Sequence, residues 1–331
     1  MKKIAIFKIV FFSIIIVILS AILVYGIFRK SSGFSFGFTN FHYSNAKAYA
    51  IAKDEMNLEI NGINQLEVHW IGGSVSITKS DDNQIHFYEL CDDEVRENEN
   101  NLMRYLIKDN KLIIQFCKST WFVKHKIQNG KELIIQLPSE AFSEVEIDAI
   151  SANIVYKDIN LSSTGFLKID VVSGNSLISN ANLTTLKIDN VSGTINLDSL
   201  HCLQKISVDT VSGSVNLNQI FTNDFNVDTV SGDVYTTGNI NAIDLESVSG
   251  NAKLILDNLP SKMECDTVSG NVTITIPDND GFKASFDSVS GVLSTNFASV
   301  ISKKEIIYKN GIVNYFFESV SGDVRIDMKN D

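Results

Sequence analysis

The chain has 331 residues, of which 44% are apolar, 20% are charged and only three are proline. That composition excludes a proline-rich linker and a disordered chain, and the many β-branched residues favour strands over helices. All 39 acidic residues follow residue 30, so residues 31 to 331 hold 23 basic residues and a formal net charge of −16, which argues against binding to nucleic acid.

Residues 9 to 28 form the first predicted element, an uncharged apolar run that ends at Arg29 and Lys30. At about 1.5 Å per residue, a helix of this length spans roughly 30 Å, the thickness of the hydrocarbon core of a bilayer. The run is too long for a signal peptide, and Leu19 stands where cleavage needs a small residue, so we predict an uncleaved membrane helix. Basic residues slightly favour a cytoplasmic segment 1 to 8 and an extracytoplasmic body, which predicts a single-pass protein of the cell membrane.

Residues 31 to 57 are predicted to form a stalk or linker. Within it, residues 31 to 50 suit equally a stalk with aromatic side chains near the membrane surface and an edge strand. Residues 58 to 157 are predicted to hold a first coil with flanking hairpins. Two degenerate repeat copies support that coil, at residues 70 to 77 and 148 to 152. The strand candidates for the hairpins are residues 85 to 90, 111 to 116 and 132 to 137. The polar stretch from residue 91 to 101 is expected to be a solvated tip.

From residue 158 to 331, the tripeptide Val-Ser-Gly recurs at intervals of 18 to 31 residues. The eight glycines are Gly174, Gly193, Gly213, Gly232, Gly250, Gly270, Gly291 and Gly322. An apolar residue stands five positions before each glycine, and apolar residues return two and four positions after most of them. Each unit is therefore predicted to be a strand, a sharp turn and a second strand.

Stacked copies of such a unit bury an apolar face that one copy cannot bury alone. We therefore predict an all-β fold, a single-chain β-solenoid with coils of about 20 residues and an N-terminal transmembrane helix. The glycines are expected to take a left-handed or crowded conformation, with Val and Ser in columns inside the turn. The long last interval leaves room for a hairpin near residues 306 to 315, which would shield the open edge. A β-sandwich is the alternative, but it does not explain why the same tripeptide marks every second strand.

An acidic residue stands four positions before each glycine. These residues are Asp170, Asp189, Asp209, Asp228, Glu246, Asp266, Asp287 and Glu318. Stacked coils would place the carboxylates about 5 Å apart, where like charges destabilise a sheet. Two interpretations offset this repulsion: each carboxylate accepts backbone N–H bonds from its own turn, or the column gathers divalent cations. The first is favoured, because short Asp side chains suit local turn bonding.

The sequence resembles a known bacterial family in four places. These are the strand pair at 68 to 77, KELIIQLPSEAFSEVEIDAISANIVY at 131 to 156, the acid-x-Val-Ser-Gly coils, and YKNGIVNYFFESVSGDVRI at 308 to 326. Together they are similar to the bacterial candidate-adhesin domain of unknown function, which occurs in LiaG-like membrane proteins and is related to head-GIN adhesin domains. The resemblance covers about residues 58 to 328. It implies a β-solenoid at the cell envelope and an association with envelope stress, and it supplies no catalytic residues.

Motifs for nucleotide binding, zinc hydrolysis, serine hydrolysis and EF-hand calcium binding are absent from the sequence. The four cysteines form no CxxC pair, and Cys265 occupies an inward apolar position, which predicts a buried core thiol. We predict no cofactor and no catalysis. The favoured function is a membrane-anchored adhesin-like or scaffold module that binds an envelope polymer or protein. The alternatives are a regulator that binds a neighbouring membrane protein and a carbohydrate-active β-helix enzyme.

Overall fold

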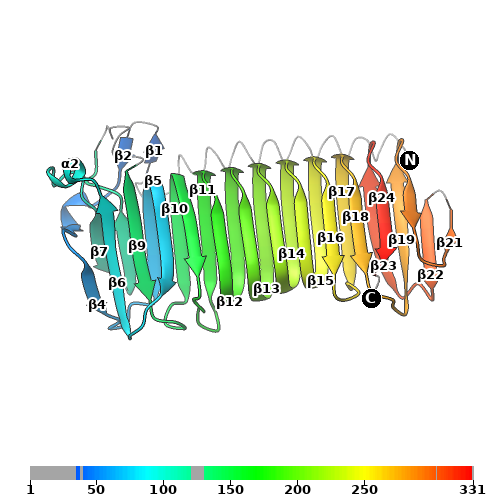
Figure 1. Ribbon diagram of the computed structural model, residues 1–331, viewed down its shortest axis with the longest axis horizontal. Coiled ribbons are helices and arrows are strands. Elements are labelled where there is room, and N and C mark those ends of the chain that lie inside the picture. The colour runs from blue at the N-terminus through cyan, green and yellow to red at the C-terminus, as the bar shows by residue number, and fades with distance from the viewer. Residues whose placement is uncertain (1–34, 38–39, 121–129, 303, 330–331) are drawn as a thin grey trace. The chain divides into compact units, whose positions relative to one another are not determined.

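The computed structural model describes residues 35–37, 40–120, 130–302 and 304–329, which are mostly β, with a large mixed sheet (Figure 1). The chain divides into two compact units, of which the N-terminal unit ends at Gly193 and the C-terminal unit begins at Thr194. The predicted membrane helix, residues 9 to 28, lies outside the described residues. Within the described part of the chain, no helix is long and apolar enough to cross a membrane.

The N-terminal unit is built almost entirely of strands, because apolar and polar residues alternate along them. Its elements are β1 (Ser35–Gly37), β2 (Asn40–His42), η1 (Ala46–Ala48), β3 (Ala50–Ile51), β4 (Met56–Glu59), β5 (Gln65–Lys79), β6 (Gln84–Cys91), α2 (Asp93–Arg96), β7 (Arg104–Lys108), β8 (Lys111–Gln115), β9 (Lys131–Leu137), β10 (Glu144–Lys157), β11 (Phe166–Ser173) and β12 (Ser176–Ser192). The one-turn helix α2 takes the place of the tip expected in the polar stretch, and most of its residues are exposed.

Parallel coils make up the middle of the N-terminal unit. Strand β10 pairs in parallel with β5 on one side and with β11 and β12 on the other. The registers place Ala152 opposite Gly73, and Asp148 opposite Asp170. Both degenerate copies of the repeat are therefore coils of the same stack, as the sequence predicts.

Hairpins cap the outer edge of these coils. Strands β8 and β9 pair in parallel with β5, and then β7 pairs antiparallel with β8 while β6 pairs antiparallel with β9. The short strands β3 and β4 pair outside β7 and β6. Antiparallel capping strands interrupt the parallel ladder, so they protect an edge that could otherwise pair with another chain. Strands β6, β8 and β9 coincide with the three strand candidates that the sequence offers for flanking hairpins.

The C-terminal unit contains the regular repeats. Its strands are β13 (Ile195–Ser212), β14 (Val215–Ser231), β15 (Val234–Ser249), β16 (Ala252–Leu256), β17 (Lys262–Ser269), β18 (Val272–Ile276), β19 (Gly281–Ser288), β20 (Leu293–Thr295), β21 (Val300–Ile301), β22 (Glu305–Lys309), β23 (Val313–Ser319) and β24 (Val324–Met328). Strands β13, β14 and β15 stack in parallel, and β16 and β17 continue the stack.

The last coils of this unit do not follow chain order. Strand β17 pairs with β23 and not with β19, and β23 in turn pairs with β19, so the last coil lies between two earlier ones (Figure 1). The hairpin of β21 and β22 lies on the outer side of β19, where β22 pairs antiparallel with it. An edge hairpin is present, but it lies at residues 300 to 309 and not at the predicted 306 to 315, where β23 already belongs to the last coil. Because the hairpin occupies the outer edge, the chain returns to the inner side of β19 for its final coil.

The core consists of the apolar residues that the repeat predicts. All eight side chains five positions before the glycines are buried, from Ile169 to Phe317, and Cys265 among them is fully buried. All four cysteines are free thiols. The expected inward columns of Val and Ser are wrong: Val211 is half-buried and Ser212 is exposed, whereas Thr210 is buried. Strand alternation explains the correction, because the residue two after the buried Val208 must also face inward.

Candidate functional site

The repeated glycine is required by the close approach of successive coils. A Cβ atom on Gly232 would lie 2.2 Å from the carbonyl oxygen of Gly213, and one on Gly193 would lie 2.1 Å from that of Gly174. Three of the glycines, Gly174, Gly193 and Gly250, also have positive φ angles of 149°, 131° and 152°. The predicted crowded conformation is confirmed, since any side chain at this position would meet the backbone of the neighbouring coil.

Hydrogen bonds within the turn come from the residue after the acid. The hydroxyl oxygens of Ser288 and Ser319 accept the N–H groups of Gly291 and Gly322, each at 2.7 Å. In another coil, the Thr267 hydroxyl donates to the carbonyl oxygen of Gly270 at 3.2 Å. In these three coils a small hydroxyl side chain helps to close the turn, whereas the equivalent hydroxyls of Thr210, Thr229 and Ser247 are buried without a hydrogen-bond partner.

A second row of bonds joins neighbouring coils just after the glycine. The Asp233 carboxylate accepts the N–H of Asn251 at 2.8 Å, and the Asn251 side chain accepts the N–H of Asn271 at 3.1 Å. The Asn271 side chain accepts the N–H of Asp323 at 3.0 Å, which continues the row into the last coil. These bonds run along the stack, so they fix the register of one coil on the next.

In the N-terminal unit the acidic column is balanced by cations. The register places Asp148, Asp170 and Asp189 side by side on β10, β11 and β12. Lys168 donates to Asp170 and Lys187 donates to Asp189, with Nζ–Oδ2 distances of 2.6 Å in both cases. Burial still raises the pKa of Asp170, to about 6, because desolvation outweighs the Lys168 ammonium.

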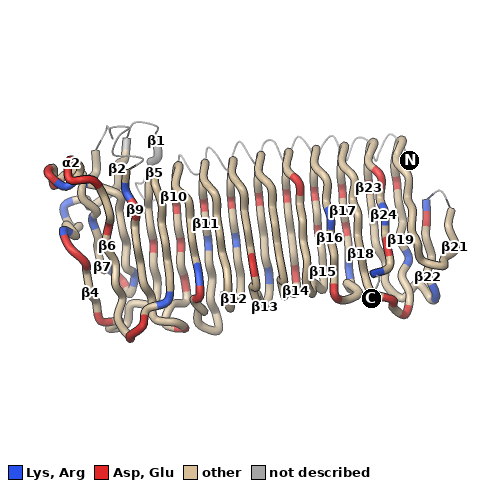
Figure 2. Tube along the Cα trace, viewed as in Figure 1, with Lys and Arg blue, Asp and Glu red and all other residues tan. Residues whose placement is uncertain are grey.

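In the C-terminal unit the acidic column has fewer cations. Registers across six strands align Asp209, Asp228, Glu246, Asp266, Glu318 and Asp287 in that order (Figure 2). Burial, followed by repulsion from neighbouring carboxylates, raises the pKa of Asp228 to about 6 and that of Glu246 to about 7. At the outer end, Lys304 lies 2.9 Å from Asp287. The carboxyls in the middle of this column therefore lose their protons at about pH 6 to 7, whereas an exposed carboxyl loses its proton near pH 4.

Within each unit the predicted acids are brought together, and the bonds shown for three of the eight go to lysines and not to the turn backbone. These three are Asp170, Asp189 and Asp287. No group of three or more His, Cys, Asp or Glu among the described residues is placed to hold a metal ion. The repeated acid is thus a row of carboxylates on a strand face, and the cation column stays a prediction.

Sequence reasoning missed a pocket of about 310 Å³ in the N-terminal unit. Its floor is formed by outward residues of β5, β8 and β7, and its roof by residues 43 to 49. The lining residues are Tyr43, Ser44, Asn45, Tyr49, Gln65, Glu67, His69, Leu106, Lys108, Asp109, Lys111, Ile113 and Gln115. His69 and Gln115 occupy the row that carries Asp148 in the next coil. The alternation of polar and apolar residues along β5 and β8 predicts which side chains face outward. It does not predict that residues 43 to 49 lie over them.

The ionised groups of the pocket are paired with one another. Glu67 lies 2.6 Å from His69 Nε2 and 2.8 Å from Lys111 Nζ, and Asp148 lies 3.2 Å from His69 Nδ1. Burial favours neutral His69, but hydrogen bonds to Asp148 and Glu67 outweigh it and raise its pKa to about 9. Burial likewise opposes ionisation of Glu67, yet bonds from His69 and Lys111 lower its pKa to about 2. The imidazolium and the carboxylate therefore remain charged as an ion pair at neutral pH.

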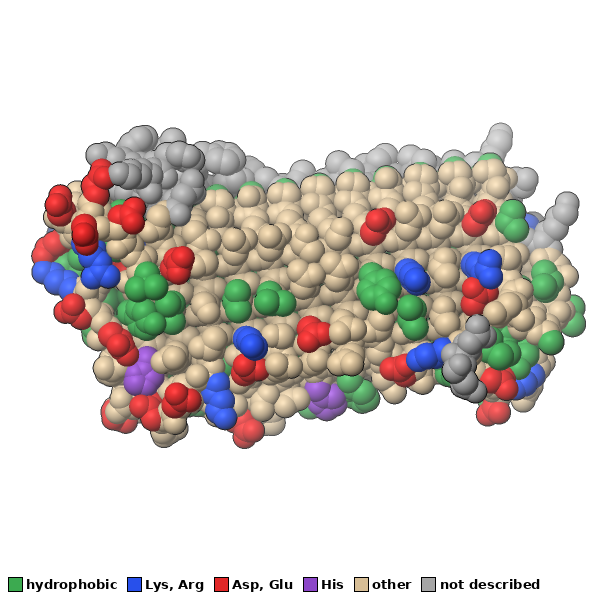
Figure 3. All heavy atoms as spheres, viewed as in Figure 1, with side chains coloured by type: hydrophobic (Ala, Val, Ile, Leu, Met, Phe, Trp, Pro, Cys, Tyr) green, Lys and Arg blue, Asp and Glu red, His purple; other side chains and the backbone are tan. Residues whose placement is uncertain are grey.

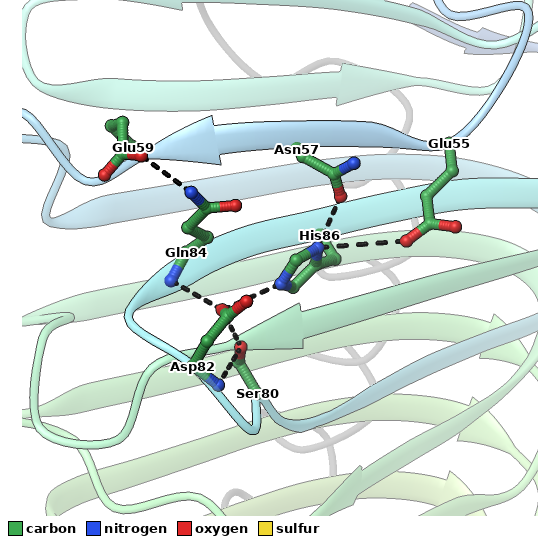
Figure 4. Close-up of polar contacts among 7 residues, drawn as sticks. All are labelled: Glu55, Asn57, Glu59, Ser80, Asp82, Gln84 and His86. Atoms are coloured by element: carbon green, nitrogen blue, oxygen red, sulfur yellow. Dashed lines mark hydrogen bonds and ion pairs between the residues drawn. The ribbon is translucent and has the colours of Figure 1, made fainter.

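A polar cluster around His86 lies on the outer strands β4 and β6 (Figure 4). His86 Nε2 lies 2.8 Å from Asp82, and its Nδ1 contacts Asn57 on β4. Asp82 also accepts the Gln84 N–H at 2.8 Å, which closes the turn between β5 and β6. The bond from His86 is the main reason that the pKa of Asp82 is lowered. These contacts tie β4 to the turn, so the cluster is structural.

Comparison with known families identifies the chain. The family model of Toastrack DUF4097 matches residues 63 to 327, which include the capped first coils and all eight acid-x-Val-Ser-Gly turns. The chain belongs to the Toastrack DUF4097 family. This match confirms the resemblance drawn from the repeated coils and the flanking segments. No curated protein matches the chain.

Several solved structures are similar to this Toastrack chain. A candidate cell adhesion protein from Clostridium sporogenes is 15% identical, with a TM-score of 0.20, and the match covers 83% of this chain and 99% of that one. A candidate adhesin from Bacteroides fragilis is 14% identical, with a TM-score of 0.43 and coverage of 82% and 96%. A candidate lipid-binding protein from Parabacteroides distasonis is 11% identical, with a TM-score of 0.41 and coverage of 84% and 96%.

Proposed function

We propose that this Toastrack chain is a non-enzymatic, membrane-anchored module of the bacterial cell envelope that acts as an adhesin-like scaffold. In this proposal the coils of both units are those of a β-solenoid, residues 9 to 28 cross the cytoplasmic membrane, and the body is displayed outside. A link to envelope stress follows only from the family resemblance.

The observation that carries the proposal is the in-register stacking of equivalent side chains. Strands in the C-terminal unit pair residue for residue, so a side chain type recurs along a face at the strand spacing of about 4.8 Å. One such row holds the six aligned carboxylates. The middle of the face seen in Figure 3 is largely neither charged nor apolar. Neighbouring coils of the C-terminal unit also stack amides, such as Asn196 and Asn216, whose side chains are bonded at 3.0 Å.

Repeated rows suit a ligand that is itself repetitive. A polymer or an ordered surface can make the same weak contact at each coil, and the contacts add through multivalency. Carboxylates accept hydrogen bonds from hydroxyl, amide and amine groups, all of which occur in wall polymers. This function needs display and contact area, and it needs no chemical step.

The test measures binding of the full-length protein to insoluble wall peptidoglycan by cosedimentation. We expect wild type to sediment, and we expect a variant with Asp209→Asn, Asp228→Asn and Glu246→Gln to sediment several-fold less. A matched variant neutralises three exposed acids away from the column, Asp54, Asp81 and Asp93, and should behave as wild type. Failure of wild type to bind, or equal loss in both variants, would contradict the proposal.

Display is tested separately in wall-stripped cells. Externally added protease should remove the body and leave a membrane-bound fragment of about thirty residues, because the small charge bias favours a cytoplasmic position for residues 1 to 8. Complete protection of the body in cells that stay intact would reject the extracytoplasmic assignment.

A further inference from the structure

The pocket in the N-terminal unit has the size and the lining of a small-molecule site. Its volume of about 310 Å³ is at the lower end of the range of ligand pockets, about 300 to 1,000 Å³. The floor is rigid, because β8 is paired on both sides, with β5 in parallel and with β7 antiparallel. The pocket therefore does not depend on a mobile loop for its base.

Gln115 supplies an unused hydrogen-bonding atom in this pocket. Gln115 is only 2% exposed, and its side chain forms a hydrogen bond with Tyr49. Its Oε1 atom has no hydrogen-bond partner. An amide has both a donor and an acceptor end, so exchanging the two ends would still leave one of them unpaired. Gln115 is also one of the residues that line the pocket, so its unpaired buried amide atom is a candidate partner for a ligand bound there.

Two tyrosines form an aromatic wall beside Gln115. Tyr43 is held in place by its hydroxyl, which donates to the carbonyl oxygen of Cys117 at 3.0 Å. Its ring meets the Tyr49 ring edge to face, with the centroids 4.9 Å apart. Tyr49 is half-buried and lines the pocket, so it combines an apolar ring with a polar tip.

The charges of the pocket leave little attraction for an ionic ligand. Glu67 is neutralised by His69 and Lys111, and Lys108 lies 3.7 Å from Asp109. His69 in turn lies 3.2 Å from Asp148, which faces it from β10. A charged ligand would have to break these pairs, whereas a neutral ligand with hydroxyl or amide groups would not.

We propose that this pocket binds a neutral saccharide unit, with one sugar face on the Tyr49 ring and a hydroxyl or N-acetyl N–H donated to Gln115. A sugar ring combines an apolar C–H face with a rim of hydroxyl groups, which matches an aromatic wall beside a buried amide. This inference goes beyond the proposed function, because it concerns a discrete pocket and not the repeated rows of the coils. It holds wherever the body is displayed.

Saturation-transfer difference NMR on the full-length protein tests the inference. The probes are N-acetylglucosamine and glucose, with glutamate as a charged comparison of similar size. We expect transfer to at least one sugar, strongest at its ring C–H protons, and none to glutamate. Absence of transfer to both sugars, or stronger transfer to glutamate, would overturn the proposal.

Two variants locate the binding. Gln115→Met keeps the volume of the side chain and removes both polar atoms, so sugar affinity should fall about tenfold. Tyr49→Ala changes a half-buried roof residue and should remove transfer altogether. The matched controls are Tyr235→Ala, an exposed tyrosine of the C-terminal unit, and Gln84→Met on β6, and both should bind as wild type. Unchanged binding in either pocket variant would overturn the assignment, as would equal loss in the controls.

The outcome is distinguishable from a failure of the proposed function. Sugar binding that depends on Gln115 supports the pocket even if the protein does not sediment with peptidoglycan. Sedimentation that depends on the acidic column, without sugar transfer, supports the scaffold and rejects the pocket.

Discussion

Gly232→Ala is the substitution that most directly tests the stacked coils. The added Cβ would lie 2.2 Å from the carbonyl oxygen of Gly213 and 2.9 Å from its carbonyl carbon. Both atoms belong to backbone that is held by the sheet, so a side-chain rotation cannot relieve the overlap. The φ angle of Gly232 is not in the positive range given for three other glycines, so the penalty here is steric.

The magnitude follows from the distance that the coils must open. Reaching an ordinary contact of about 3.4 Å requires a local separation of roughly 1 Å. Neighbouring ladder bonds such as Val215 N–H to Asp233 O, now 2.9 Å, would then exceed hydrogen-bond range. Two lost ladder bonds at about 1 kcal/mol each, with about 1 to 3 kcal/mol of strain, give a destabilisation of about 3 to 5 kcal/mol.

Urea unfolding of the full-length protein, followed by far-ultraviolet circular dichroism, measures this change. Ser231→Ala is the matched control, because Ser231 is exposed in the same turn, and its free energy of unfolding should stay within about 0.5 kcal/mol of wild type. If Gly232→Ala also stays within that limit, close coil contact is not the reason for the repeated glycine.

Three further predictions concern charge and modularity. In the folded chain the pKa of Asp228 is about 6 and that of Glu246 about 7, so folding favours the protonated forms more than the unfolded chain does. This contribution is lost as the pH rises through these values. The free energy of unfolding should therefore fall by about 1 to 2 kcal/mol between pH 4 and pH 7 after allowance for solvent screening. Urea midpoints across this range check it; Asp228→Asn with Glu246→Gln should flatten the profile, and a rise with pH would contradict the assigned shifts. Lys131→Met should lower the free energy of unfolding by about 3 kcal/mol, because the buried Glu89 carboxylate, 2.5 Å from Lys131 Nζ, then has no cation beside it. Adding Glu89→Gln to this variant should recover part of the lost stability in the same urea assay. No recovery would show that the loss comes from packing and not from the unpaired charge. Deleting residues 213 to 231 removes one whole coil and keeps the register of the others, so circular dichroism should show a shorter folded protein. Deleting half of that range should unfold the protein, because it shifts the register of the strands that follow. Equal effects of the two deletions would contradict the coil assignment.

Much of the fold could be predicted because each coil repeats the same local pattern. Ile169, Val208 and Phe317 share one position of the repeat, and all are buried as the alternation requires. The glycine position was also predictable, since only a residue without a side chain recurs there. Local patterns cannot state which coils are neighbours, however, and the order β17, β23, β19 depends on long-range pairing.

The polar side chains were harder to assign from the pattern alone. The acid of each repeat was expected to bond its own turn, yet the bonds found there come from the next residue, as in Ser288 and Thr267. Both residues are short and polar, and only the direction in which a strand presents them separates their roles. The partners of Asp170 and Asp189 are lysines two residues earlier, on the same strand face.

The sequence by itself determined the repeated strand-turn-strand unit, its inward apolar residues and its crowded glycine, because these depend on spacing within about 20 residues. Only the tertiary structure decided the balance of charge along the acidic column and the existence of the pocket. His69 and Gln115 are far apart in the chain and become neighbours through the pairing of β5 with β8, and residues 43 to 49 then cover them. A pocket made by three separate segments has no local signature, because its shape depends on which strands pair and not on any one stretch of residues.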